Sequence, residues 1–238
     1  SNFSLTTNLF FLHPGANLIS FPVPGTVGIG DGIPDNVEEY FIGIIGEGQA
    51  TILNPSIGWV GSLVGFEGTK GYWVTVDRTF DFSFDLTNIL SRSSIQNEFE
   101  SPYEFIQSTQ QAFYFIEEIE NIEEGDIVMA YCNETLVGTR EWTGSYTDIP
   151  AMGVDGSEYT HNYCEIGAIP TFKVEKTDGE VFELEGDISA WESNGLFMVS
   201  SLGVKQVLPE QYSLSNAYPN PFNPTTTINF AIPTDSKV

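Results

Sequence analysis

The residues that could support catalysis are few and poorly spaced for it. The 238-residue chain has two histidines, His13 and His161, and His161 lies in the polar stretch EYTHNYC. A serine nucleophile needs a histidine base beside it and an acid behind that base, and no GxSxG elbow supports such an arrangement. The 33 Asp and Glu residues are so numerous that their abundance does not single out a carboxylate pair for glycosidic cleavage. We therefore assign no catalytic residue and expect a non-enzymatic protein.

One acidic stretch has the composition of a cation-binding loop. The sequence GDGIPDNVEE places Asp31, Asp35 and Glu38 close together beside glycines, and calcium takes about 6–8 oxygen ligands. The D-x-D-x-D-G ladder of an EF-hand loop is missing, so the alternative is a Gly-Asp turn followed by a helix cap. These three residues are the candidate calcium ligands, and no other cofactor is expected. A second, weaker candidate is the stretch YTDIPAMGVDGSEYT, with Asp148, Asp155 and Glu158.

Two of the four tryptophans are candidates for binding sugar rings. Trp59 and Trp142 sit beside glycines near expected loops, where a flat exposed indole can stack on a glycan. Trp73 alternates into the expected strand GYWVTV and belongs to the core. The alternative for Trp59 and Trp142 is burial against a sheet, the commoner fate of a large aromatic side chain.

The chain has two cysteines, Cys132 and Cys164. In an exported protein an even number is compatible with one disulfide, which would stabilise the fold by roughly 3–4 kcal/mol in the loop-entropy model. The alternative is two small buried thiols, because the spacing of cysteines does not determine their connectivity. Two cysteines without a nearby histidine pair do not predict a zinc site.

The charge balance limits the partners of this chain. Asp and Glu outnumber Lys and Arg by 33 to 8, and the net charge is −25. Such a surface repels phosphate, which argues against nucleic acid and anionic lipid as partners. No apolar run approaches the roughly 20 residues of a membrane-spanning helix, so no direct membrane insertion is expected. The acids either form a solvated surface in a salty medium, where the Debye length is about 10 Å or less, or cluster to bind calcium.

The sequence pattern predicts a mainly β protein with two β-rich domains of the sandwich type. Short apolar runs alternate with Gly, Pro and Asn turns through residues 1–90 and 91–205. A single helix is expected near residues 35–45, where Val37, Tyr40, Phe41 and Ile44 follow helical spacing. The pattern-poor residues 88–101 are the expected linker. Asp178-Gly179, between two alternating stretches, predicts a hairpin turn.

The last stretch, residues 206–238, differs from the body. Pro219, Pro221 and Pro224 forbid a helix and fix an extended or turning path, and a β-branched stretch follows. The segment YSLSNAYPNPFNPTTTINFAIP resembles the opening of the C-terminal Por sorting domain that the type IX secretion system of Bacteroidetes recognises. This resemblance implies a small β-sandwich that directs export across the outer membrane. The family pattern would continue beyond Val238, so we expect a truncated copy.

The body is similar, more loosely, to recurrent β-rich modules of large secreted proteins that carry such a tail. The segments GWVGSLVGFEGTKGYWVTVD and EEGDIVMAYCNETLVGTREWTG carry this similarity. It implies extracellular architecture and little chemistry, whereas the C-terminal segment implies the type IX machinery as a partner. Together the two resemblances predict a secreted or outer-surface location and a structural or adhesive function that involves glycans or other surface proteins. Two alternatives stay open: a carbohydrate-binding module of a larger secreted enzyme, or a hydrolase.

Overall fold

The computed structural model describes residues 9–90, 101–205, 213–216, 218, 225–227 and 230–231. The chain divides into two compact units, Ser1–Val204 and Lys205–Val238. The first unit contains both β-rich regions expected from the sequence, and the mainly β, sandwich-like character is confirmed. Among the described residues, no helix is both long and apolar enough to cross a membrane.

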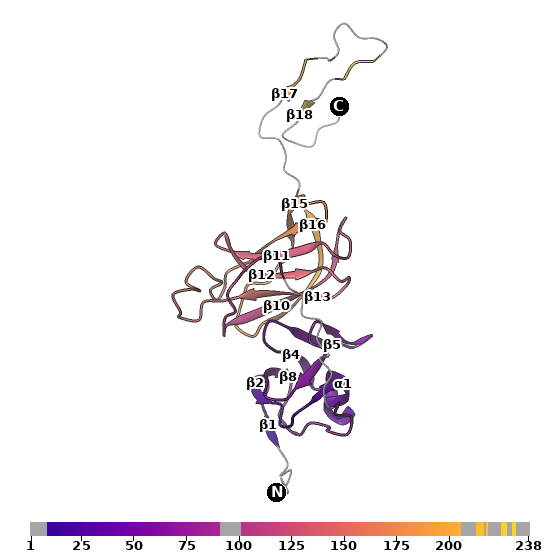
Figure 1. The fold of residues 1–238 in the computed structure, drawn as a ribbon, viewed down its shortest axis with the longest axis vertical. Helices are drawn as coiled ribbons and strands as arrows, with labels where there is room; N and C mark the ends of the chain where they lie inside the picture. The colour runs from indigo at the N-terminus through magenta and orange to yellow at the C-terminus, as the bar shows by residue number, and fades with distance from the viewer. Residues whose placement is uncertain are drawn as a thin grey trace. The chain divides into compact units, whose positions relative to one another are not determined.

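The first region is built on a five-stranded antiparallel sheet (Figure 1). Its order is β2 (Gly15–Ser20), β8 (Gly71–Val76), β4 (Phe41–Ile45), β5 (Ala50–Asn54) and β6 (Gly58–Gly61). Two short ribbons accompany it, β1 (Phe10–Leu12) with β9 (Phe80–Phe82) and β3 (Thr26–Gly28) with β7 (Gly65–Glu67). Their aromatic side chains, among them Phe66 and Phe82, fill a core between sheet and ribbons.

The prediction of a helix near residues 35–45 is wrong for most of that range. Helix α2 (Asp35–Glu38) has four residues, and a second short helix, α1 (Ile29–Gly32), precedes it. The apolar residues that followed helical spacing continue as strand β4, which pairs with both β5 and β8. The sequence FIGII is rich in β-branched residues and contains a glycine, and both features favour a strand over a helix interior. Burial on both faces of β4 hid the alternation typical of a strand.

The second region is built on a seven-stranded sheet (Figure 1). Its order is β12 (Thr135–Glu141), β11 (Ile127–Cys132), β14 (Thr171–Glu175), β15 (Val181–Gly186), β16 (Leu196–Val204), β10 (Gln111–Ile119) and β13 (Thr147–Met152). The pairing is antiparallel except between β10 and β16, which run parallel. The hairpin predicted at Asp178-Gly179 is confirmed, because β14 and β15 pair across it and Gly179 has φ +89°.

This sheet curves until its two outer strands, β12 and β13, approach each other. A Cβ added at Gly138 of β12 would lie only 1.8 Å from the carbonyl oxygen of Pro150 in β13, so only glycine fits at that position. Arg140 Nε also donates to the carbonyl oxygen of Asp148 at 3.0 Å. The curved sheet encloses a large apolar core that includes Tyr114, Phe172 and Trp191.

The two regions of the first unit meet through a buried apolar cluster. Its fully buried members come from β4, β5 and β10: Ile45, Ala50, Ile52, Phe113 and Phe115. The approach is close, because a Cβ at Gly61 would lie 2.8 Å from the ring of Phe115. The two sheets therefore pack directly on one another within the first unit.

A buried carboxylate, Asp148 in β13, adds a polar network to this joint. Its oxygens accept hydrogen bonds from Ser62 N at 2.8 Å, Ser62 Oγ at 2.7 Å and Ala50 N at 3.2 Å. Arg140 Nη2 lies 3.3 Å from Asp148 Oδ2 and donates to Gly48 O at 2.7 Å. Burial raises the pKa of Asp148, and the charge of Arg140 and the hydrogen bonds from Ser62 and Ala50 act against that rise. Asp148 thus links the two sheets through hydrogen bonds and an ion pair that occupy its oxygens.

Within the second unit the structure describes one short pairing. Strand β17 (Ser213–Leu214) is antiparallel to β18 (Phe230–Ala231), and Tyr218 bridges to Thr227. Residues 219–224, the centre of the motif that resembles a sorting signal, lie outside the described residues, as do linker residues 91–100.

Candidate functional site

The three residues expected to bind calcium lie on the two short helices of the first region. Asp31 is in α1, whereas Asp35 and Glu38 are in α2. Glu38 Oε1 accepts a hydrogen bond from Trp59 Nε1 at 2.7 Å, and Asp31 Oδ1 accepts one from Asn88 Nδ2 at 3.3 Å. The described part of the chain holds no group of three or more His, Cys, Asp or Glu side chains that could hold a metal ion. The calcium assignment stays a prediction.

Trp59 and Asp31 line the same hollow, of about 370 Å³, with glycine and aliphatic neighbours. Trp59 is half-buried, packs edge-on against Phe41 at 6.4 Å between ring centroids, and has its indole N–H fixed by Glu38. One candidate platform residue, Trp59, and one candidate ligand, Asp31, therefore line a single hollow, and Glu38 holds the indole N–H of Trp59. Trp59 is the one aromatic side chain among the residues that line this hollow.

Trp142 is placed differently. Its exposed fraction is 6%, and it belongs to the apolar core of the second region. A ring buried to this degree has no face to offer a sugar, so the expectation of a platform at Trp142 does not hold. Gly144, two residues further on, has φ +101° and allows the chain to turn there. The indole of Trp142 packs into the core, which is the alternative that the sequence left open.

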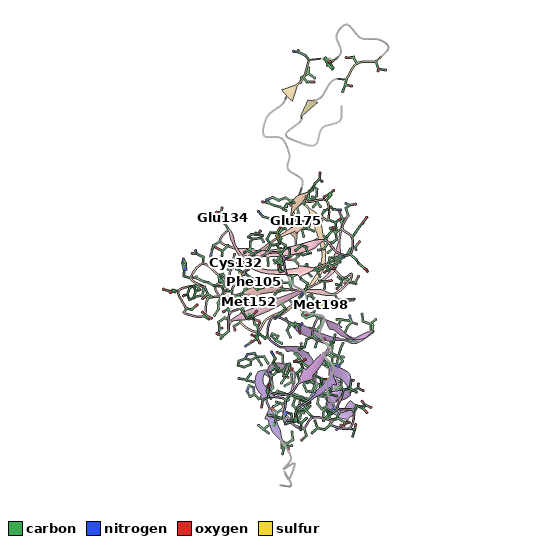
Figure 2. All side chains as sticks on the ribbon, in the orientation of Figure 1. Phe105, Cys132, Glu134, Met152, Glu175 and Met198 are labelled. Carbon is green, nitrogen blue, oxygen red and sulfur yellow. A yellow bond between two sulfur atoms is a disulfide. The ribbon has the colours of Figure 1, made fainter. Side chains whose placement is uncertain are left out.

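Cys132 and Cys164 form a disulfide, one of the two alternatives that the sequence left open. Cys132 ends strand β11, and Cys164 lies beyond β13, where it bridges to Gly153. Cys132 is labelled in Figure 2 on the second region. The bond ties the loop after β13 to the β11–β12 hairpin, and that loop carries Tyr159 and Tyr163.

Beside this disulfide lies the largest hollow that we describe, of about 750 Å³, which we call the tyrosine groove. It is lined by three tyrosines, a phenylalanine and a few polar and aliphatic residues: Ser101, Tyr103, Glu104, Phe105, Ile106, Thr135, Leu136, Tyr159 and Tyr163. Phe105, labelled in Figure 2, packs against the core of the second region. Three chain segments thus converge here: residues 101–106, the start of β12, and the loop after β13.

Most of the rings in the tyrosine groove are fixed before any ligand arrives. The hydroxyl of Tyr163, which is buried, accepts a hydrogen bond from the backbone N–H of Ile106 at 2.8 Å. The hydroxyl of Tyr103 donates to Glu175 in β14, and this bond raises the pKa of Tyr103. Tyr159 differs because its exposed fraction is 65%. The groove therefore has a rigid aromatic floor and one open ring.

The loop that carries Tyr159 is organised by Asp155. Asp155 Oδ1 accepts hydrogen bonds from Thr160 Oγ1 at 2.7 Å and from Ser157 N at 3.0 Å, and Oδ2 accepts one from Thr109 N at 3.4 Å. The hydrogen bond from Thr160, followed by those from Ser157, lowers the pKa of Asp155 below its usual range. The carboxylate therefore holds the turn that precedes Tyr159.

Acidification is expected to release this turn. Because the folded pKa is lowered, Asp155 stabilises the turn above the pKa of an unfolded aspartate, about 4, and this stabilisation is lost as the pH falls through the folded value. The amide shift of Ser157, followed by NMR, should therefore be constant near neutral pH and change with a midpoint below about pH 4. Asp155→Asn should abolish that step, and a midpoint at or above about pH 4 would contradict the assignment.

The tyrosine groove was not predicted from the sequence, although two short stretches rich in aromatic residues belong to it. Tyr103 and Phe105 alternate in SPYEFI, and Tyr159 and Tyr163 flank His161 next to a cysteine. Only the disulfide and the curvature of the sheet bring these segments together. His161 itself is exposed, with Nδ1 2.8 Å from Glu158 O.

Among the described residues, the tyrosine groove brings aromatic rings and polar side chains together in one hollow. The buried joint between the two sheets keeps the rest of the first unit as a single body around it. Compared with family models, with characterised proteins and with solved structures, the chain has no match.

Proposed function

We propose that this chain is a non-enzymatic adhesion module, exported by type IX secretion and displayed outside the cell, that holds its partner in the tyrosine groove. The observation that carries the proposal is the groove itself, a concave surface with a prearranged aromatic floor and one exposed ring. Large, stiff, amphipathic tyrosines provide contact area at low entropic cost. Such a surface suits binding without chemistry.

Three further observations support this proposal. The disulfide between Cys132 and Cys164 persists in oxidising compartments such as the bacterial periplasm and the cell exterior. The buried joint built on Asp148 and Phe115 lets two sheets act as one body, which suits a structural element under mechanical load. The tail that resembles a sorting signal supports type IX export as the route.

The proposal is tested by expressing the full chain, behind a signal peptide, in a bacterium that has type IX secretion. The chain should be accessible to antibody on intact cells or in the medium, and it should be retained in the periplasm of a strain that lacks the secretion pore. Cells that display it should resist washing from glass coated with a neutral polysaccharide better than cells without it. Because the tail is expected to be a truncated copy, the matched control carries a complete type IX sorting domain in place of residues 206–238. Retention of both chains in the periplasm of the secreting strain would refute the route, and display without gain in attachment would refute adhesion.

A further inference from the structure

We propose that the tyrosine groove binds a neutral glycan, with the ring of Tyr159 stacked on the C–H face of a pyranose. This inference rests on the proposed adhesive function and names its ligand. It also moves the expected sugar platform from Trp142, which is buried, to Tyr159, which is exposed.

The size and lining of the groove fit one or two sugar rings. Its volume of about 750 Å³ lies within the roughly 300–1,000 Å³ of ordinary ligand sites. The face of an aromatic ring carries negative potential, so it attracts the positively polarised C–H groups of a pyranose. Tyr159, with 65% of its surface exposed, is the ring in this groove whose face is open to such stacking. Phe105 and Tyr163 form the apolar wall behind it.

The polar side chains of the groove match the hydroxyl groups of a sugar. Ser101 Oγ accepts hydrogen bonds from Tyr103 N at 3.0 Å and from Thr139 Oγ1 at 2.6 Å. A hydroxyl has one donor and two acceptor sites, so with both acceptor sites used the proton of Ser101 is left to donate. The exposed carboxylate of Glu104 adds an acceptor, and Thr135 lines the groove opposite. A sugar hydroxyl can therefore accept a hydrogen bond from Ser101 and donate one to Glu104.

Charge restricts the glycan to a neutral one. The chain has a net charge of −25, and the immediate surroundings of the groove are acidic as well. Glu104 lines it, Glu134 is exposed next to Thr135, and Glu175 holds the hydroxyl of Tyr103. A uronic acid or sulfated sugar would meet like charge at short range, which costs binding energy. Uncharged hexoses and N-acetylhexosamines avoid that cost.

The architecture of the groove reduces the entropic cost of binding. The disulfide and the hydrogen bonds of Asp155 fix the chain on both sides of Tyr159. Tyr103 and Tyr163 are held through their hydroxyl groups. Because rigid groups lose little freedom when a ligand binds, a small number of stacking and hydrogen-bond contacts is enough for measurable affinity.

The test is a titration of the purified full chain with four neutral hexasaccharides, followed by NMR and by isothermal titration calorimetry. The probes are hexamers of β-1,4-glucose, α-1,4-glucose, β-1,4-xylose and β-1,4-N-acetylglucosamine, with hexalysine as the peptide arm. At least one hexasaccharide should shift the signals of Tyr159 and Thr135. Tyr159→Ala should weaken that binding about five- to tenfold, and Tyr159→Trp should restore it. Phe11→Ala, which removes a 71% exposed ring of the first region, is the matched control and should leave binding unchanged.

The outcomes separate this inference from the proposed function. Absence of binding to every hexasaccharide, or unchanged affinity in Tyr159→Ala, overturns the glycan assignment. Binding of hexalysine alone overturns it in favour of a basic peptide. Neither result decides the proposed adhesive function, which the washing experiment tests separately. Because Tyr159 is mostly exposed, its replacement should not alter the unfolding transition, and circular dichroism of each variant checks this.

Discussion

Asp148→Ala is expected to lower the free energy of unfolding by about 3–5 kcal/mol, the usual loss when one partner of a buried ion pair is removed. The side chains of Asp148 and Arg140 are 2% and 11% exposed. Without the carboxylate, Arg140 stays inside the joint with no counter-charge, and the backbone N–H groups of Ala50 and Ser62 lose their acceptor. Both consequences carry a desolvation penalty.

Urea unfolding of the full chain, monitored by tryptophan fluorescence, measures this loss. Ser62→Ala is the matched control, because it removes only the hydroxyl bond to the Asp148 carboxylate and should cost about 1.5–3 kcal/mol. Calorimetry of Asp148→Ala should also show that the two sheets melt less cooperatively, since the joint holds them together. A loss for Asp148→Ala no larger than that for Ser62→Ala would show that the network does not stabilise the joint.

Removal of the disulfide is the second change with a large expected effect. The two cysteines are 32 residues apart in sequence, and a loop of this length gives about 3–4 kcal/mol in the chain-entropy model. Cys132→Ala/Cys164→Ala should therefore lower the free energy of unfolding by that amount. Because the bond also ties down the loop of Tyr159 and Tyr163, hexasaccharide binding should weaken as well.

The two effects can be measured separately. Denaturant unfolding reports stability, whereas titration well below the unfolding midpoint reports the groove. Treatment of the natural chain with a reductant, verified by mass spectrometry, is the matched control and should reproduce the double variant. A double variant that loses stability but binds as tightly as the natural chain would show that the loop keeps its position without the bond.

The strands of this protein are largely predictable from sequence because their signals are local. Asp178-Gly179 predicts a tight turn, and the turn exists, since glycine tolerates the positive φ that such a hairpin needs. The segment Phe41–Ile45 is a strand that its local sequence pattern does not predict. Its apolar residues fit a helical period and a doubly buried strand equally well, and only pairing with β5 and β8 decides between them.

The candidate site was less predictable because its parts are distant in sequence. The two cysteines are a candidate pair in the sequence and form a disulfide in the structure, whereas a tryptophan next to a glycine is a poor predictor of an exposed aromatic platform. Trp142 met that criterion and is buried. Tyr103 and Tyr159, separated by more than half of the second region, meet only because β11, β12 and the loop after β13 converge. A single sequence contains no signal for such convergence.

The parallel pairing of β10 with β16 affects how the second region would respond to mechanical tension. The ladder runs from Phe113–Leu196 to Ile119–Leu202, and the chain continues from the end of β16 toward the tail. A pull between Gln111 and Val204 would slide the two strands past each other instead of peeling them apart. All the evenly spaced hydrogen bonds of the ladder would then be stretched together, whereas an antiparallel hairpin pulled at its open end breaks them one by one. Under such a pull, the ladder between β10 and β16 would be loaded in shear along its whole length.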